Sequence, residues 1–267
     1  MRAMRSGSLR SEKKRNIRHR WLKAAFCAAF ICAGLAFASV SVLRSKGLMF
    51  DSAPHISEYP CRGALLSENS GRINWDRFNE SYISFVYIRA SKGISFKDRQ
   101  FENNRKGVVR SGLPYGFIHD FDFTSDGGMQ AEAFLELIGD LTGQLVPVID
   151  LRKNLFERLF CSDSRAVSER LSELIEKLSQ AAGGRVMLWV DRDAYDEYQS
   201  LAGNCLILAE DSDTDAFCPD WTLLAYSDNG SSAGLADKGK YYTELSAGNN
   251  VTKQELEEQL RIKNDNN

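Results

Sequence analysis

The sequence of 267 residues has little positive charge outside its first 23 residues. That segment holds nine Lys or Arg and one acid, so the remainder carries a formal charge of about -10 within a total of -2. A soluble nucleic-acid-binding protein needs a basic surface on its folded body, so nucleic acid is excluded as a partner. A composition of 43% hydrophobic and 26% charged residues also excludes a fibrous or wholly disordered protein.

Patterns typical of metal and nucleotide sites are also missing. None of the six cysteines form the close double spacing of a zinc site. The acidic stretch 210–215 lacks the glycine and terminal glutamate of an EF-hand loop, so we interpret it as a solvated loop rather than a weak calcium site. No glycine-rich phosphate loop follows the first predicted strand. We therefore expect neither a metal nor a cofactor.

One long apolar run lies near the amino terminus. Residues 21–43 carry a single charge, Lys23, and about 20 such residues cross the roughly 30 Å hydrocarbon layer of a membrane. The preceding segment is much more basic than the following one, which holds Arg44 and Lys46, so the amino terminus is expected in the cytoplasm. We predict a single-pass anchor in a bacterial cytoplasmic (inner) membrane, with a periplasmic or extracellular body. A signal peptide cleaved after 36–38 (Ala-Phe-Ala) is the alternative.

Four cysteines follow the apolar run, an even number that suggests two disulfides in an exported domain. Four cysteines permit three connectivities. We favour Cys205 with Cys218, because each begins an apolar run, and Cys61 with Cys161 by elimination. Unpaired thiols are the alternative.

After a linker over 44–60, short apolar runs alternate with helical patterns. The runs predict strands at 62–67, 83–90, 113–121, 145–151, 185–190, 204–209 and 221–227. Helices are predicted at 98–111, 129–141, 164–182 and 191–201. This alternation predicts an α/β fold of parallel strands joined by crossovers, and favours a closed TIM-like (β/α) barrel over an open doubly wound sheet. The expected organisation is a basic cytoplasmic tail (1–20), a transmembrane helix (21–43), the linker, the barrel (61–249) and a polar tail (250–267).

Several barrel segments share their residues with a known family. They are 71–75 (GRINW), 83–93 (ISFVYIRASKG), 112–119 (GLPYGFIH), 130–134 (QAEAF), 145–150 (LVPVID), 226–227 (YS) and 234–235 (GL). In order and spacing, residues 62–248 resemble glycoside hydrolase family 25, the Chalaropsis-type lysozymes or muramidases. The resemblance implies an irregular TIM-like barrel that cleaves the β-1,4 link after N-acetylmuramic acid in peptidoglycan.

The resemblance also shows where this sequence departs from the family's catalytic pattern, which uses paired carboxyl groups. The family's general acid is expected two residues after Asp150, but Arg152 stands there. A guanidinium stays charged and cannot donate a proton to a leaving group. Family acids are also replaced at the positions of Leu65, Lys92 and Tyr241. Asp150 is the one acid clearly retained, so the site is interpreted as degenerate.

Asp120 and Asp122 are candidate substitutes for the lost acids. Alternate residues of a strand share a face, and barrels place their active sites at the carboxyl ends of the strands. We favour a different arrangement, in which Arg152 and Arg89 pair with Asp150 and one of these aspartates. A carboxylate beside a cation has a lowered pKa, which is unsuited to a proton donor.

Further candidates lie near the expected cleft. Lys92 and Arg152 would make it cationic, suited to the carboxylates of muramic acid or stem peptides, although internal ion pairs are the alternative. His119 ends a strand beside the two aspartates and is expected to point into the cleft with them. The aromatic candidates, which either stack on a sugar ring or pack in the core, are Tyr115, Trp189 and Tyr226.

Two functional hypotheses remain. The favoured one is a membrane-anchored, lysozyme-like domain that binds peptidoglycan, a muropeptide or another envelope protein without hydrolysis. The alternative is an active muramidase that uses Asp150 with Asp120 or Asp122. Fold similarity supports both equally, since function depends on the site.

Overall fold

The computed structural model describes residues 21–23, 25–39, 60–79, 82–161, 164–210, 217–218, 220–230, 234–235, 240, 242–248 and 251–262. The tail 1–20, most of the linker, Tyr241, the acidic residues 211–215 and the last residues 263–267 lie outside this description. The chain divides into two units, Met1–Met49 and Phe50–Asn267.

The first unit contains the helix Trp21–Ser39. Its mean hydropathy is 1.8, and it is long and apolar enough to cross a membrane. A membrane anchor and a signal sequence share these properties.

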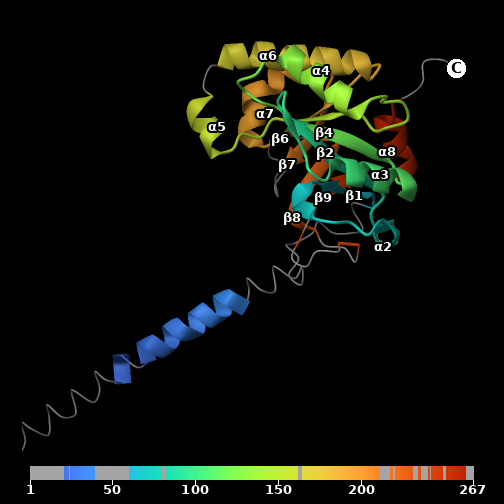
Figure 1. Ribbon diagram of the computed structural model, residues 1–267. Coiled ribbons are helices and arrows are strands. Elements are labelled where there is room, and N and C mark those ends of the chain that lie inside the picture. Colours follow the sequence, from blue (N-terminus) through green and yellow to red (C-terminus); the bar gives the residue numbers. More distant parts are fainter. Residues whose placement is uncertain are drawn as a thin grey trace, which may run out of the picture. The chain divides into compact units, whose positions relative to one another are not determined.

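The second unit is a closed barrel, as predicted (Figure 1). Among the described residues, eight strands form the ring, in which β1 pairs in parallel with β2, and β9 closes the barrel by running antiparallel to both β1 and β8. A short strand, β3 (Phe96–Lys97), adds to β2 outside the ring. The ring strands are β1 (Arg62–Leu66), β2 (Phe85–Lys92), β4 (Tyr115–Asp120), β5 (Val148–Asp150), β6 (Met187–Val190), β7 (Leu206–Glu210), β8 (Leu223–Gly230) and β9 (Tyr242–Ala247).

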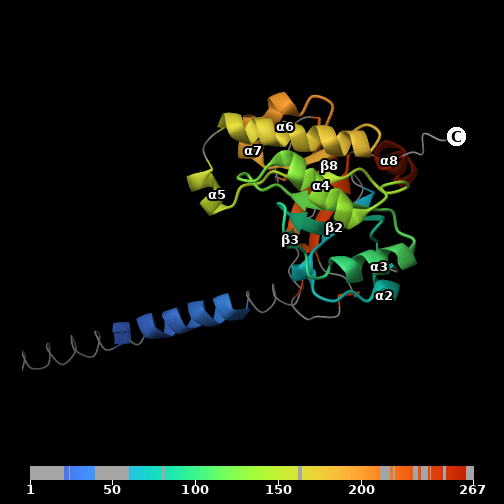
Figure 2. The same cartoon turned by 45° about the horizontal axis from the view of Figure 1, so that its top comes forward.

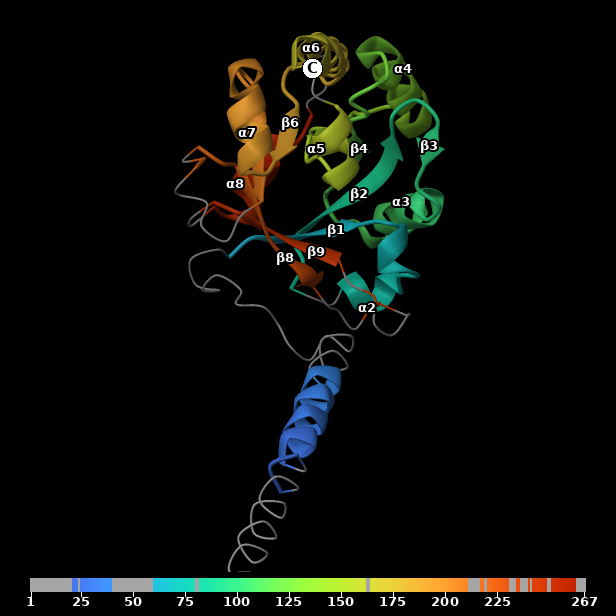
Figure 3. The ribbon, with the colours of Figure 1, turned by 90° about the vertical axis from the view of Figure 1, so that its left-hand side faces the viewer.

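Helices surround the parallel part of this ring. In Figure 3, α3, α4, α6 and α7 follow one another around the barrel, whereas β8 and β9 lie on the side away from α4 and α6. Figure 2 shows α4 and α6 lying side by side. The helical elements are η1 (Glu68–Ser70), α2 (Trp75–Asn79), α3 (Phe101–Ser111), α4 (Gly127–Ile138), α5 (Leu155–Phe160), α6 (Ser164–Ala181), α7 (Arg192–Tyr198), η2 (Gln199–Leu201) and α8 (Lys253–Leu260).

Aromatic rings and glycines together close the barrel interior. A Cβ at Gly63 would lie 2.3 Å from the ring of Phe85, and one at Gly116 would lie 2.5 Å from the ring of Tyr87. Both rings are fully buried, and the Tyr87 hydroxyl donates to the Val146 carbonyl at 3.2 Å. A larger residue at either glycine would overpack the interior. The next residue on this face of β2 is Arg89, which therefore points to the barrel mouth.

The predicted disulfides are not formed. The four cysteines Cys61, Cys161, Cys205 and Cys218 are free thiols. Cys61 directly precedes β1, at the amino ends of the parallel strands. Cys161 follows α5, which begins beyond the carboxyl end of β5. Burial raises the pKa of the Cys205 thiol to about 11.

Candidate functional site

The strand register brings charged side chains into one row at the barrel mouth. Lys92 on β2 is paired in register with Asp120 on β4, Asp120 with Asp150 on β5, and Asp150 with Trp189 on β6. Residues in register on parallel strands point to the same face, so these four side chains surround the carboxyl ends of the strands. The mouth therefore contains Asp150 and one of the two aspartates that are candidate substitutes for the family's acids.

Arg152 is bound on both sides by carboxylates. Its Nε donates to Asp150 Oδ1 at 2.9 Å and its Nη2 to Asp150 Oδ2 at 2.7 Å, while Nη1 donates to Glu210. The guanidinium also stacks on Trp189, with Cζ 3.4 Å from the ring centroid. Burial disfavours its charge, but the carboxylates of Asp150 and Glu210 more than offset this and raise the pKa of Arg152. The predicted Arg152–Asp150 ion pair is thus present, and it occupies the mouth with a permanent cation.

Asp120 forms the second ion pair, with Arg89. Burial is the largest effect on Asp120, the neighbouring charge of Asp150 adds to it, and together they raise the pKa of Asp120 to about 6 despite Arg89. Arg89 lowers the pKa of Asp120, as expected of a paired cation, but the net pKa is raised. The desolvation of the carboxylate outweighs its attraction to one guanidinium.

Lys92, in the row at the mouth, and Asp122, just after β4, each have partners of their own. Lys92 Nζ lies 2.6 Å from Glu157 Oε1 of α5, so its charge is held in an internal ion pair. Asp122 follows β4, and its carboxylate accepts hydrogen bonds from its own turn, at 2.9 Å from the Thr124 amide and 2.5 Å from Ser125 Oγ. Burial raises the pKa of Asp122, but these hydrogen bonds outweigh burial and the pKa is lowered. Asp122 is therefore an ionised turn residue and is unsuited to donate a proton.

His119 does not point into the mouth, which corrects the expectation from the sequence. It alternates with Asp120 on β4 and so faces outward, where Nδ1 lies 2.9 Å from Ser91 Oγ and Nε2 lies 3.2 Å from Gln130 Oε1 of α4. The ring is fully buried, and this burial lowers the pKa of His119 to about 4. The histidine is a neutral packing residue between the barrel and α4.

The remaining predicted positions lie away from the ion pairs. Tyr115 begins β4, at the opposite end from Asp120, and its ring packs edge-on against Phe117 at 5.6 Å. Tyr226 of β8 lies with its ring 5.8 Å from the Arg62 guanidinium. Leu65 is a buried residue of β1. The structure thus brings Arg89, Lys92, Asp120, Asp150, Arg152 and Trp189 together, and it places His119, Tyr115 and Tyr226 elsewhere.

The sequence analysis did not name Glu157 or Phe96, and it placed Glu210 in a solvated loop, whereas Glu210 is the last residue of β7. Glu210 ends β7 and binds Arg152, Glu157 binds Lys92, and the ring of Phe96 lies 5.2 Å from the Arg89 guanidinium. A carboxylate directly after a predicted buried strand was a usable signal for Glu210. Within the described residues, no group of three or more His, Cys, Asp or Glu side chains has the arrangement of a metal site.

Comparisons with known proteins agree with this fold. The family model of glycosyl hydrolases family 25 matches residues 66–235. A family 25 glycosyl hydrolase from Bacillus anthracis is 25% identical, with a TM-score of 0.69 over 78% of this chain and 99% of that one. The autolytic lysozyme of Clostridium acetobutylicum is 27% identical over 94 residues, which are 35% of this chain and 29% of that relative. This chain thus aligns with less than a third of that curated relative.

A third comparison concerns an autolysin, LytC from Streptococcus pneumoniae, whose structure was solved in complex with a synthetic peptidoglycan ligand. It is 16% identical, with a TM-score of 0.58 over 73% of this chain and 47% of that one. This likeness shows the fold.

Proposed function

Because this chain belongs to glycosyl hydrolase family 25, we propose that its lysozyme-like barrel binds peptidoglycan or a muropeptide without cleaving it. The observation that carries the proposal is the position of Arg152. Its guanidinium contacts both Asp150 and Glu210, so two of the mouth carboxylates hold a cation in place of a reacting sugar. Hydrolysis needs one protonated carboxyl group and one free carboxylate beside the glycosidic bond.

The rim of the mouth retains features that suit binding. Lys92 lies there with about a third of its side chain exposed, whereas the Trp189 ring is buried beneath Arg152. On α5, Leu155 and Phe156 are 75% and 67% exposed. Exposed apolar groups beside a charged cleft suit a sugar face, or a second protein of the cell envelope, as the bound partner.

The proposed location follows from the first unit. The helix Trp21–Ser39 would span the bacterial cytoplasmic (inner) membrane once, with the basic tail in the cytoplasm and the barrel in the periplasm or outside the cell. Tethering would keep the barrel within reach of the cell wall. The proposed organisation is a cytoplasmic tail (1–20), a transmembrane helix (21–43), a linker (44–60), the barrel (61–249) and a polar tail (250–267).

A second candidate, an active muramidase, is favoured by Asp120. With a pKa of about 6, this carboxyl group is partly protonated near neutral pH and could act as the general acid, with Asp150 as its partner. Arg89 and Arg152 oppose this role, because each holds one of the two carboxylates.

The test uses the full chain in a non-ionic detergent, incubated with purified peptidoglycan. Release of reducing sugar and cosedimentation with sacculi are measured for the wild type, Asp150→Asn and Asp120→Asn. We expect no release and clear cosedimentation. Release that either substitution abolishes would establish the muramidase and overturn the binding-only proposal, whereas neither release nor cosedimentation would indicate a protein partner.

A further inference from the structure

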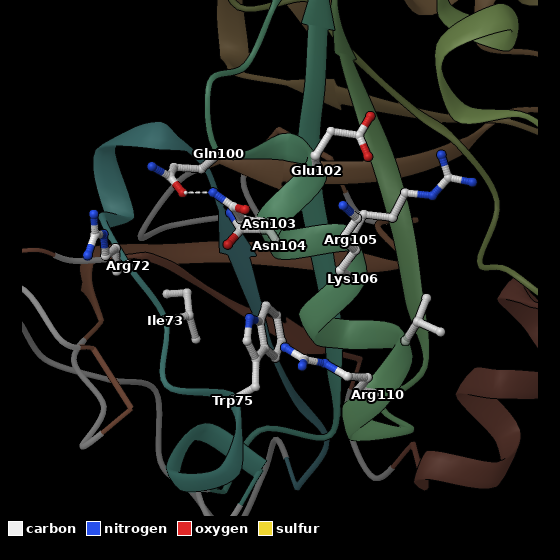
Figure 4. Close-up of a pocket in the computed structure, with 11 residues that line it drawn as sticks. Arg72, Ile73, Trp75, Gln100, Glu102, Asn103, Asn104, Arg105, Lys106 and Arg110 are labelled. Atoms are coloured by element: carbon white, nitrogen blue, oxygen red, sulfur yellow. Dashed lines mark hydrogen bonds between the residues drawn. The ribbon is translucent and has the colours of Figure 1, made fainter.

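A cavity of about 900 Å³ lies outside the barrel ring, along α3 and the segment before α2. It is formed by the segment that enters α2 and by the exposed face of α3 (Figure 4). None of its lining residues belongs to the ion pairs at the mouth. A ligand pocket in a protein typically encloses about 300–1,000 Å³, so the cavity is large enough for one or two sugar units.

The lining of this α2–α3 cavity is strongly cationic. Four basic side chains line it, Arg72, Arg105, Lys106 and Arg110, against one acid, Glu102. Glu102 is already paired with Lys97, at 2.9 Å. Within the described part of the chain, no ion pair involves Lys106 or Arg110. Because the chain beyond its basic tail carries a charge of about -10, this local excess of positive charge is a specific feature.

The cavity also has a rigid aromatic wall and a buried polar group. Trp75 packs against Gly107, where a Cβ would lie 1.8 Å from the indole Nε1. The ring can approach α3 this closely only because residue 107 is glycine. Figure 4 shows the indole between Ile73 and Arg110. Asn104 is 1% exposed, and its Nδ2 has no hydrogen-bond partner among the described residues. Buried donors are nearly always satisfied, so this amide lacks an acceptor.

We propose that the α2–α3 cavity binds an acidic glycan, with a sugar ring at the exposed edge of Trp75 and its phosphate or carboxylate groups beside Lys106 and Arg110. An aromatic plane beside cations suits a ring that carries an anionic group. Trp75 is 9% exposed, so a ligand meets only the edge of its ring. This site is independent of the barrel mouth, and it would give the anchored domain a second attachment to the cell wall.

The test measures binding of the full chain in a non-ionic detergent by titration calorimetry. The probes are phosphorylated dextran, polygalacturonate, neutral dextran and glycerophosphoglycerol, the last of which represents a lipid headgroup. We expect at least one anionic polymer to bind while neutral dextran does not. The polymer that binds more tightly identifies phosphate or carboxylate as the preferred group.

The decisive variant is Lys106→Gln with Arg110→Gln, since both side chains are exposed and their loss leaves the fold intact. Its matched control is Arg165→Gln with Arg185→Gln, which removes the same charge from exposed side chains that do not line the cavity. We expect at least a tenfold loss of affinity in the first variant and less than a twofold loss in the control. The proposal would be overturned if the two variants lost affinity equally, or if neutral dextran bound as well as the anionic polymers. It would also be overturned if no polymer bound, or if glycerophosphoglycerol bound more tightly than the polymers.

Discussion

Replacing Arg152 by glutamine is expected to lower the free energy of unfolding by about 3 kcal/mol at pH 7. The side chain donates two hydrogen bonds to Asp150 and one to Glu210, and it is 26% exposed against 11% for the Asp150 carboxylate. Removing one partner from a buried ion pair costs about 3–5 kcal/mol, because the other charge stays desolvated. Partial exposure of the guanidinium places the expected loss at the lower end of that range.

For a domain of this size, such a loss lowers the melting temperature by roughly 6–12 °C. The loss should shrink as the pH falls towards 4, because carboxylates that have lost their cation take up protons more readily. The assay is urea and thermal unfolding of the full chain in detergent, followed by circular dichroism at pH 7 and pH 4.

Arg165→Gln is the matched control. Arg165 pairs with Glu169 on the surface of α6, with side chains 91% and 68% exposed. Exposed pairs of this kind contribute at most about 0.5 kcal/mol. If Arg152→Gln were no more destabilising than this control, the guanidinium would not be holding the mouth carboxylates, and our account of the mouth would be refuted.

Three further predictions concern Asp120, His119 and Gly107. The pKa of Asp120 rises from 3.8 to about 6 on folding, so ionisation of Asp120 destabilises the wild type as the pH rises from 4 to 6. The free energy of unfolding of Asp120→Asn, relative to that of the wild type, should therefore be about 2–3 kcal/mol higher at pH 7 than at pH 4, as measured by urea unfolding. A relative stability that is the same at both pH values would contradict this. The pKa of His119 falls from 6.5 to about 4 on folding, so the wild type loses about 3 kcal/mol of stability as the pH falls through that range. His119→Gln should not show this loss in urea unfolding at pH 7 and pH 4. A variant as sensitive to acid as the wild type would count against the prediction. Gly107→Ala should destabilise the protein by about 1–3 kcal/mol although alanine has the better helix propensity, because the added methyl group would displace Trp75. Urea unfolding would measure the loss, and near-ultraviolet circular dichroism would report the displaced indole. A stabilised variant would be inconsistent with the packing of Trp75 on Gly107.

Local features of the sequence were sufficient for much of the fold. The buried strands of the parallel part follow from apolar runs, and the predicted ranges agree with β1, β2 and β4 to β8 within a few residues. The strand β9 was not predicted, because Tyr242–Ala247 mixes polar and apolar residues and pairs antiparallel between β1 and β8. Its role in closing the barrel depends on partners far away in the sequence.

The pairing of Arg152 with Asp150 was predictable, because the two residues are separated by one position at the end of a strand and their side chains start on the same face. The replacement of the family's acid by Arg152 remains a prediction that rests on the resemblance.

Only the tertiary structure decided which other groups face the mouth and how they titrate. Glu210 joins Arg152 across 58 positions of sequence, and His119 turns away towards α4 although it is next to Asp120. The pKa of Asp120 rises because burial and the nearby charge of Asp150 act through space. Desolvation and electrostatic interaction depend on distance and on the exclusion of water, which are set by strand register and helix packing and are not encoded by the neighbouring residues of the chain.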